Sequence, residues 1–200
     1  MNYLAHLYLA DPTPDSLLGN LIADFVKGRD VATLSEAIQS GILMHRQVDR
    51  FTDCHPVVQR SICRISKKWG WFSGILIDVY YDHILALNWE RWSAEPLRSF
   101  VDRVHVCLHK NIDLVPAVGE PLLRLIASDR LFSYRSSEGI AEALMYLSRR
   151  IEERMPGKNI QLQDAMPDLR DCHGELTGDF QEFFPTMIAF VEELRAKAGG

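Results

Sequence analysis

Residues 15–26 read Asp-Ser-Leu-Leu-Gly-Asn-Leu-Ile-Ala-Asp-Phe-Val, and apolar side chains return in them every three or four positions. The spacing i, i+3, i+4, i+7 and i+8 is typical of a helix that buries one side. Asp15 or Ser16 can cap its first turn, directly after Pro14, and Gly28 can close its far end. The stretch therefore predicts an amphipathic helix. Its apolar positions are Leu17, Leu18, Leu21, Ile22 and Phe25.

The same helical period continues over nearly the whole chain. Sustained alternation of apolar and polar residues is missing, and so are the Asn-Gly and Asp-Gly pairs of tight hairpins. We expect one all-α domain over residues 1–200, made of eight or nine helices, because no break between helices is long enough to be a linker. The breaks are expected at Pro12/Pro14, Pro56, Gly70, Pro96, Pro116, Pro156–Gly157 and Pro185. The further helices are expected at 33–51, 56–69, 73–90, 94–112, 118–128, 136–154, 162–172 and 174–197.

The composition is that of a globular protein. Of the 200 residues, 47% are hydrophobic and 24% are charged, which excludes disorder and fibrous repeats. The formal net charge is −5, which argues against general nucleic-acid binding, because such binding needs a broad basic face. The apolar N-terminal segment has no basic residues before it and is too short to span a bilayer. We therefore expect a cytoplasmic protein without a membrane anchor. The cysteines form no C-x-x-C pair, so neither a disulfide scaffold nor a zinc knuckle is expected; they are Cys54, Cys63, Cys107 and Cys172.

Several ionisable residues occupy positions that a plain helical bundle would fill with apolar side chains. A buried carboxylate is costly unless a metal, an arginine or the N–H groups of a helix neutralise it. The most apolar stretch of the chain, residues 75–85, contains three of these residues within six positions. The full set is His6, Asp24, His45, Asp49, Asp53, His55, Asp78, Asp82 and His83.

The sequence spacing of some of these residues predicts which of them share a face of a helix. Residues four apart lie on one face of a helix, and both His45/Asp49 and Asp78/Asp82 have this spacing. His83 lies about 100° further round the same helix. Imidazoles and carboxylates together suit Mn²⁺, Fe²⁺ or Zn²⁺, whereas Mg²⁺ prefers oxygen ligands. The pattern favours one polyvalent site in the interior of a helical domain.

Less specific explanations exist for some of these residues. A single histidine on an apolar helix, such as His6, is more often a hydrogen-bonded core residue than a ligand. Asp53 and His55, which precede Pro56, are more often a helix cap and a loop histidine. The signatures of P-loop, Rossmann, α/β-hydrolase and zincin proteins are absent. The His-Asp doublet of the HD phosphohydrolases is also absent in that order, but a metal held by His and Asp can still activate water for phosphoester hydrolysis.

Four N-terminal blocks resemble the acyl carrier protein phosphodiesterase family. They are Met-Asn-Tyr-Leu-Ala-His-Leu-Tyr-Leu-Ala at 1–10, Leu-Gly-Asn-Leu-Ile-Ala-Asp-Phe-Val-Lys-Gly at 18–28, Gly-Ile-Leu-Met-His-Arg-Gln-Val-Asp-Arg-Phe-Thr-Asp-Cys-His-Pro at 41–56, and Asp-Val-Tyr-Tyr-Asp-His at 78–83. Ser148-Arg149-Arg150 and Phe183-Phe184-Pro185 are weaker matches that follow in the expected order. The resemblance therefore covers almost the whole chain.

This resemblance implies an all-α hydrolase that is a divergent, HD-phosphohydrolase-like protein. It implies removal of the 4′-phosphopantetheine arm from holo-acyl carrier protein, with Mn²⁺ as the preferred metal. Two other functions stay open from the residues alone: a metal-dependent phosphohydrolase of nucleotides or other small phosphoesters, and a helical binding module without enzymatic activity. The family's polar motif residues fall on His6, Asp24, His45, Arg46, Asp49, Asp53, His55, Asp78, Asp82 and His83.

The resulting hypothesis gives each residue a role. Asp49 or Asp78 would orient a ligand histidine or accept a proton from the attacking water. Arg46 would hold the negative charge of the phosphodiester, as guanidinium groups do for phosphate. The expected metal ligands are His6, Asp24, His45, Asp82 and His83.

A basic stripe is expected on the helix after Pro56. Acyl carrier proteins of this type are acidic, as the resemblance implies, and this chain is itself net negative, so docking needs a local basic patch. The alternative is an ordinary solvated face. The basic stripe consists of Arg60, Arg64, Lys67 and Lys68, with Trp69 and Trp71 at its end.

Overall fold

Apolar residues at helical spacing form helices along the chain, and none of the residues that the structure describes lies in a β-strand. The structure is a computed structural model that describes residues 1–198, apart from the side chains of Arg29, Ala117 and Ala198. Nine of its α-helices have seven or more residues, which confirms the predicted all-α class. The α-helices are α1 (Tyr3–Leu9), α2 (Pro14–Ile22), α3 (Arg29–Ala32), α4 (Glu36–Cys54), α5 (Pro56–Trp69), α6 (Ser73–Leu87), α7 (Leu97–Asn111), α8 (Gly119–Ala127), α9 (Arg130–Ser133), α10 (Ser137–Arg154), α11 (Met166–Asp171) and α12 (His173–Ala198). Short 3-10 turns lie at Gly70–Phe72, Trp89–Arg91, Ile112–Leu114, Pro116–Val118 and Leu162–Ala165.

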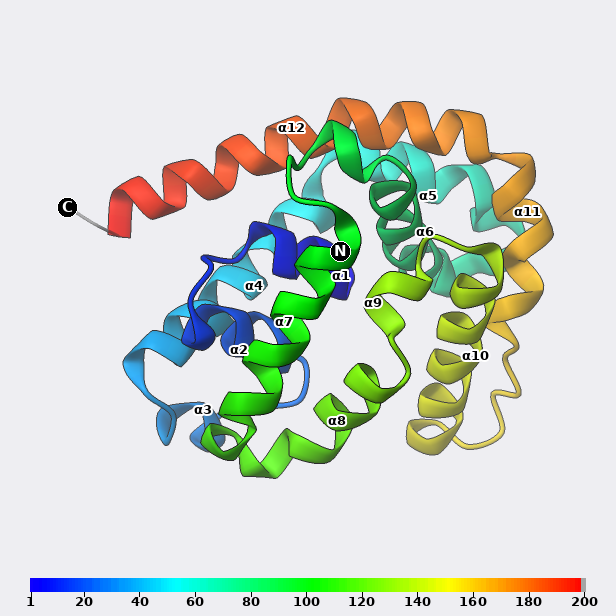
Figure 1. The fold of residues 1–200 in the computed structure, drawn as a ribbon. Coiled ribbons are helices and arrows are strands. Elements are labelled where there is room, and N and C mark those ends of the chain that lie inside the picture. Colours follow the sequence, from blue (N-terminus) through cyan, green and yellow to red (C-terminus); the bar gives the residue numbers. More distant parts are fainter. Residues whose placement is uncertain (199–200) are drawn as a thin grey trace.

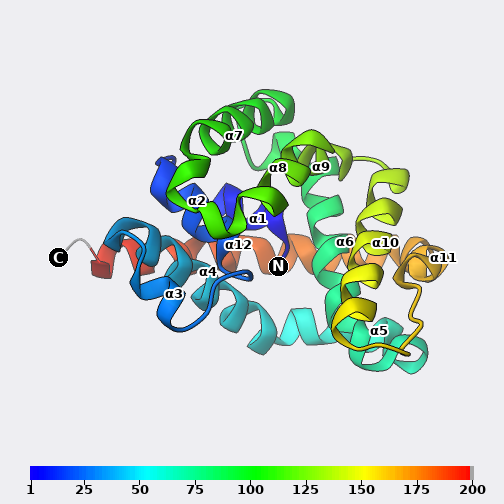
Figure 2. The same ribbon diagram turned by 90° about the horizontal axis from the view of Figure 1, so that it is seen from below.

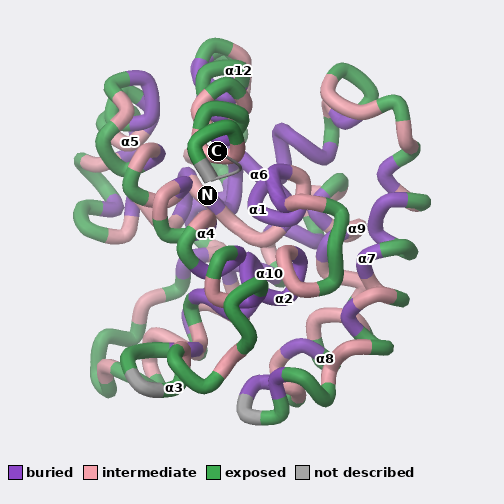
Figure 3. The backbone as a smooth tube through the Cα atoms, turned by 90° about the vertical axis from the view of Figure 1, so that its left-hand side faces the viewer, coloured by how far each residue is buried: buried purple, intermediate pink, exposed green. Residues whose placement is uncertain are grey.

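The helices enclose one hydrophobic core. Helix α12 runs along one side of the molecule and packs against α4, α5 and α6, whereas α7 packs against α2, and α10 against α6 (Figures 1 and 2). The buried segments gather around α1 and α6 (Figure 3). The first residues of the chain consequently lie in the middle of the molecule. Among the described helices, none combines the length and the apolar character needed to cross a membrane.

Two glycines allow α2 and α4 to pack backbone against backbone. A Cβ atom added to Gly19 would clash with the carbonyl oxygen of Ile38 and lie 2.8 Å from the Cα of Gly41. A Cβ atom added to Gly41 would lie 2.9 Å from the carbonyl oxygen of Ser16. The two helices therefore hold their side chains in a fixed relation, which positions the functional site described below.

The helix predicted from residues 15–26 has different ends in the structure. Its N-cap is Thr13, whose hydroxyl accepts a hydrogen bond from the Ser16 N–H, instead of Asp15 or Ser16. The reason is that Pro14 occupies the first helical position, where its fixed φ and missing N–H cost nothing, so the cap must precede it. The helix ends at Ile22, and the chain then turns.

Other helix boundaries differ from the predictions in a few places. Helix α5 has the predicted bounds, but α4 covers 36–54 instead of 33–51. Pro185, which was predicted as a break, lies inside α12. A proline within a helix removes one backbone hydrogen bond. Four large side chains around it are fully buried, and each buried Phe or Met stabilises the fold by about 1.5–3 kcal/mol, which outweighs that loss. They are Phe180, Phe183, Phe184 and Met187.

Candidate metal centre and active site

Four ionisable side chains converge where α1, α4 and the turn after α2 meet. The Nε2 atom of His6 lies 3.0 Å from Oδ1 of Asp49, and the Nε2 atom of His45 lies 3.0 Å from Oδ2 of the same carboxylate. The two imidazole rings are stacked, with centroids 3.7 Å apart. Oδ1 of Asp24 approaches the Nε2 atom of His45 to 3.5 Å. These four residues are named the His–Asp cluster.

Local structure explains why these residues meet. His45 and Asp49 are one turn apart on α4, so they present their side chains on one face. Asp24 lies in the turn after α2, and the close packing of α2 on α4 brings it to His45. His6 belongs to α1, which packs against both α2 and α6.

The two histidines form the floor of the cluster and the two aspartates form its rim. His6 and His45 are 1% and 3% exposed, whereas the side chains of Asp49 and Asp24 are 36% and 58% exposed. The cluster is therefore open to solvent on its carboxylate side, where a substrate can reach it.

The charges within the cluster are unevenly shared. Burial lowers the pKa of His6 to about 4, against the hydrogen bond with Asp49, so its imidazole is neutral at pH 7. Burial also acts to lower the pKa of His45, but the facing carboxylates of Asp24 and Asp49 raise it to about 9. Burial would raise the pKa of Asp49, yet the two histidines and the Met1 ammonium hold it well below its usual range. The interaction with His45 lowers the pKa of Asp24 as well.

Three residues of the cluster could hold a divalent cation. His6, His45 and Asp49 each offer one ligand atom, and these atoms lie within 4.8 Å of one another. Within the described part of the chain, the buried Nε2 atom of His45 has no partner in hydrogen-bond geometry, although two carboxylate oxygens face it. Two imidazole nitrogens with carboxylate oxygens suit Mn²⁺, Fe²⁺ or Zn²⁺. Three members of this cluster, His6, Asp24 and His45, are among the metal ligands expected from the sequence.

Asp82 and His83, which were also expected as ligands, lie outside the cluster. Asp82 is fully buried, and its two oxygens accept hydrogen bonds from the N–H groups of Leu4 and Ala5, at 2.7 and 3.0 Å. Those groups belong to the first turn of α1, which has no side-chain cap of its own. Asp82 thus performs from α6 the role of an N-cap. The Nδ1 atom of His83 bonds to the carbonyl oxygen of Tyr134 at 2.6 Å.

Asp78 and Arg46 lie next to the cluster without joining it. The α-amino group of Met1 donates to Asp78 at 3.1 Å and lies 3.7 Å from Asp49, so it links the two carboxylates. Burial raises the pKa of Asp78 in spite of this ammonium group. Arg46 is exposed, and its guanidinium donates to the carbonyl oxygen of Val26 at 3.4 Å.

Asp53 and His55 are not part of the cluster either. His55 is the N-cap of α5, where its Nδ1 atom accepts a hydrogen bond from the Val57 N–H at 3.3 Å. Asp53 is exposed near the end of α4. The helix cap expected at Asp53 is therefore His55, the residue directly before Pro56, and Asp53 lies within α4.

Most of the basic stripe is occupied by ion pairs within the molecule. Arg60 and Arg64 both bind the carboxylate of Asp179 on α12, which is 3% exposed. Lys68 binds Asp168 on α11 at 2.7 Å. Among the described contacts, Lys67 is the one member of the stripe without an ion pair. The stripe therefore joins α5 to the two C-terminal helices, and its docking role stays a prediction.

Asp49 was expected to orient a ligand histidine or to accept a proton, and both histidines share its carboxylate. Its spacing from His45 was the signal for this expectation. Sequence reasoning missed one feature of this region. The aromatic residues Tyr3, Phe25 and Tyr146 line a cavity beside the cluster, and no local pattern marks them because they come from three distant segments.

Fold and site together define a class: helical proteins with a solvent-open imidazole and carboxylate centre suited to a divalent cation. The family model described as "Acyl carrier protein phosphodiesterase" matches residues 1–187. Relatives with the same name include a Yersinia enterocolitica protein, 32% identical over 195 residues that cover 96% of this chain and 98% of the relative. Another, from Pectobacterium atrosepticum, is 33% identical over 194 residues that cover 96% of this chain and 98% of the relative. The chain belongs to the acyl carrier protein phosphodiesterase family. No solved structure matches it.

Proposed function

We propose that this protein hydrolyses the phosphodiester that links 4′-phosphopantetheine to the serine of holo-acyl carrier protein, which releases the apo form. Membership of the family over residues 1–187 supports this substrate. The observation that carries the chemistry is the His–Asp cluster, in which two buried imidazoles and two accessible carboxylates converge. The packing of helices does not by itself require such a group of ionisable side chains.

We further propose that the cluster holds a divalent cation, with Mn²⁺ as the expected ion. His6, Asp24, His45 and Asp49 would be its ligands. A bound cation of this kind supplies a polarised phosphoryl oxygen and water of lowered pKa. Asp49 accordingly moves from the catalytic group of the sequence hypothesis to the ligands, and Asp82 and His83 leave the ligand set.

The remaining roles belong to groups at the rim of the cluster. Arg46 is exposed beside His45 and close to the turn that carries Asp24, so it is placed to bind a phosphodiester oxygen. Asp78 faces the same region through the Met1 ammonium, and burial raises its pKa, which makes it a better proton acceptor than an ordinary carboxylate. The buried histidines do not need to move, because packing already fixes them.

The direct test is the mass of purified holo-acyl carrier protein after incubation with this protein and Mn²⁺. The expected result is loss of the phosphopantetheine arm, abolished by a chelator. His45→Ala and Asp49→Ala should each reduce the rate by at least about a hundredfold and lower the bound Mn²⁺ measured by elemental analysis.

His109→Ala is a matched control, because His109 is exposed on α7, away from the cluster. It should leave both the rate and the metal content unchanged. If His45→Ala still binds Mn²⁺ and cleaves at the unmutated rate, the proposed centre is wrong. Cleavage of a small phosphodiester without any cleavage of the carrier protein would favour a small phosphoester as the substrate.

A further inference from the structure

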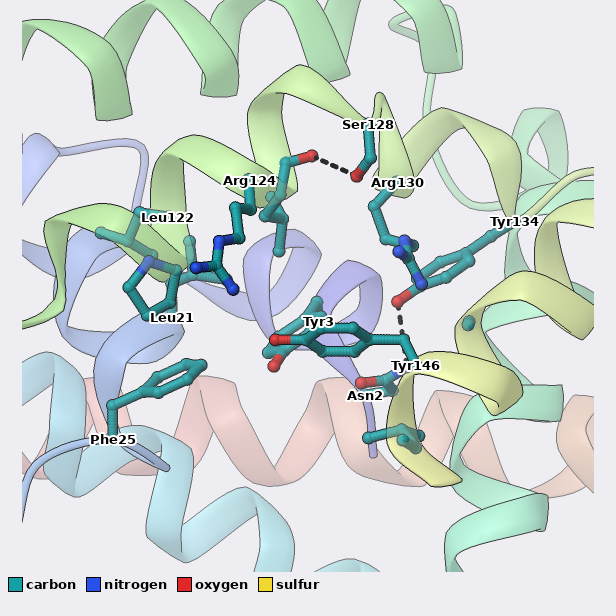
Figure 4. Close-up of a pocket in the computed structure, with 14 residues that line it drawn as sticks. Asn2, Tyr3, Leu21, Phe25, Leu122, Arg124, Ser128, Arg130, Tyr134 and Tyr146 are labelled. Carbon is teal, nitrogen blue, oxygen red and sulfur yellow. Dashed lines mark hydrogen bonds between the residues drawn. The ribbon is translucent and has the colours of Figure 1, made fainter. Parts of the chain in front are cut away.

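A cavity of about 210 Å³ has Tyr3 in its wall, and burial together with the nearby carboxylate of Asp24, a member of the His–Asp cluster, raises the pKa of Tyr3. Its walls come from the start of α1, the turn after α2, and the helices α8 and α10 (Figure 4). Most of its lining is apolar or aromatic, so the cavity suits a hydrophobic group. The aromatic and leucine side chains that enclose it include Tyr3, Phe25, Leu122, Leu125, Tyr134 and Tyr146.

The cavity and the cluster share their supporting segments. Asn2 lines the cavity, and His6 lies one helical turn further along the chain. The backbone N–H of His6 donates a hydrogen bond to the carbonyl oxygen of Asn2 at 3.2 Å. Phe25 lines the cavity and directly follows Asp24 of the cluster. A substrate whose reacting phosphate lies at the cluster therefore has an adjoining apolar space for the group attached to that phosphate.

Arg130 lines this space and Arg150 stacks on aromatic rings of its wall, and among the described side chains neither has a carboxylate partner. Arg124, which also lines the space, is paired with Glu120. The guanidinium carbon of Arg150 lies 5.0 Å from the ring centroid of Phe25 and 5.9 Å from that of Tyr146. The guanidinium carbon of Arg130 lies 5.3 Å from the ring centroid of Tyr146. Aromatic faces attract such cations and hold them in place. The edge of the cavity is thus positively charged.

We propose that this cavity receives the part of the prosthetic arm next to its phosphate, and that Arg150 binds the phosphate. This inference rests on the proposed function. In 4′-phosphopantetheine the carbon skeleton next to the phosphate carries a branched dimethyl group, which is the most apolar part of the arm. The cavity, the cation at its edge and the cluster beside it match the order of apolar group, anion and scissile bond.

The size of the cavity limits what it can enclose. Sites that bury a whole drug-sized ligand usually have about 300–1,000 Å³, and this cavity has about 210 Å³. It therefore encloses one segment of the arm, and the thiol end stays outside. The ligand class is a phosphorylated chain with a branched apolar segment beside the phosphate, and groups on the distal thiol are tolerated.

Calorimetric titration with 4′-phosphopantetheine and with pantetheine, which lacks the phosphate, tests the assignment of Arg150. Arg150→Gln should weaken binding of the phosphorylated ligand by about tenfold, the value of one lost charge-assisted hydrogen bond, and leave pantetheine binding unchanged. Arg149→Gln is the matched control, because Arg149 is exposed and contacts the Sδ atom of Met145 on the same helix. Equal effects of the two variants would overturn the role of Arg150.

Filling the cavity tests the occupant. Ala143 lines the cavity and is 3% exposed; Ala143→Leu should weaken binding of both ligands by about tenfold or more. Ala141→Leu, two residues earlier on α10 and outside the lining, should bind both as the unmutated protein does. Thermal melting shows that each variant is folded, and Arg150→Gln, at a part-exposed position, keeps the test valid if Ala143→Leu does not fold.

These experiments distinguish failure of the cavity assignment from failure of the proposed function. If holo-acyl carrier protein is cleaved but Ala143→Leu and Arg150→Gln bind both ligands normally, only this inference is wrong. If the carrier protein is not cleaved but 4′-phosphopantetheine binds and Ala143→Leu prevents it, only the proposed function is wrong. Failure of the unmutated protein to bind 4′-phosphopantetheine also overturns the inference.

Discussion

Asp82 shows how one buried residue positions the site without belonging to it. Its carboxylate accepts two backbone N–H groups at the start of α1, where the helix dipole favours a negative charge. The anchored turn carries His6 to Asp49, 3.0 Å away. A polar residue in the most apolar helix of the protein is thus explained by the end of another helix.

Asp82 should also make stability depend on pH. Burial raises its pKa to about 7, and the N–H groups of Leu4 and Ala5 counteract this only in part. A carboxyl with a higher pKa in the folded state binds more protons when folded. Its contribution to stability is therefore complete below about pH 4 and is lost as the pH rises towards 7.

The variant Asp82→Asn should remove this part of the pH dependence. Its amide does not titrate, so the free energy of unfolding should fall less between pH 5 and pH 7.5 than it does in the unmutated protein. Urea unfolding at pH 5 and pH 7.5 measures this difference. Asp53→Asn, at an exposed position, should behave as the unmutated protein does. Identical pH slopes for the unmutated protein and Asp82→Asn would contradict this explanation.

The packing of α2 on α4 determines how closely two cluster residues approach each other. Gly19→Ala should push the helices apart, because the new Cβ would meet the backbone of Ile38 and Gly41. We expect a loss of about 1–3 kcal/mol in the free energy of unfolding. We also expect weaker Mn²⁺ binding, because Asp24 follows α2 and His45 lies on α4.

Denaturant unfolding and calorimetric metal titration check this prediction. Gly178→Ala is the control, because a Cβ atom there has no neighbour within 4 Å. Since it replaces a glycine within α12, it should raise stability by up to about 1 kcal/mol. A Gly19→Ala variant with unchanged stability would show that the two helices can separate without cost.

Helical periodicity predicted elements better than it predicted contacts between them. The bounds of α5 agree because its apolar spacing and Pro56 are local signals. The pairing of Arg60 with Asp179 joins residues 119 positions apart, and such a contact leaves no local pattern. The cost of burial predicted that Asp82 needs a partner, but its choice between a metal and helix N–H groups depended on where α1 begins.

At the scale of the whole molecule, α12 is held to the rest of the fold by Asp179. Its carboxylate binds Arg60, Arg64 and the hydroxyl of Ser61, which in turn bonds to Tyr81 at 2.8 Å. This buried group of contacts ties α5, α6 and α12 together. The basic stripe therefore has a structural role whether or not it also contacts a partner.

Two charge-reversal variants distinguish the structural role of the basic stripe from a role in contacting a partner. Arg64→Glu places a carboxylate beside Asp179 and should lower the free energy of unfolding by about 2–4 kcal/mol. Lys67→Glu, at an exposed position, should change it by less than about 0.5 kcal/mol. Scanning calorimetry gives both values. An unchanged Tm for Arg64→Glu would contradict the structural role.

The same variants test docking. A higher KM of Lys67→Glu for holo-acyl carrier protein, at unchanged Tm and with unchanged hydrolysis of a small phosphodiester, supports docking on the basic stripe. An unchanged KM contradicts it.

The position of α12 in the chain matters during synthesis on the ribosome. The four cluster residues lie within the first 49 positions, whereas α12 begins at His173. At about 5–20 residues per second, the growing chain waits several seconds for this helix. Until α12 emerges, Tyr81 and Trp92 lack their partners Phe180 and Phe184. A prematurely terminated product thus carries every ligand of the proposed centre on an open core, and we expect proteases to degrade it before it can act as an enzyme.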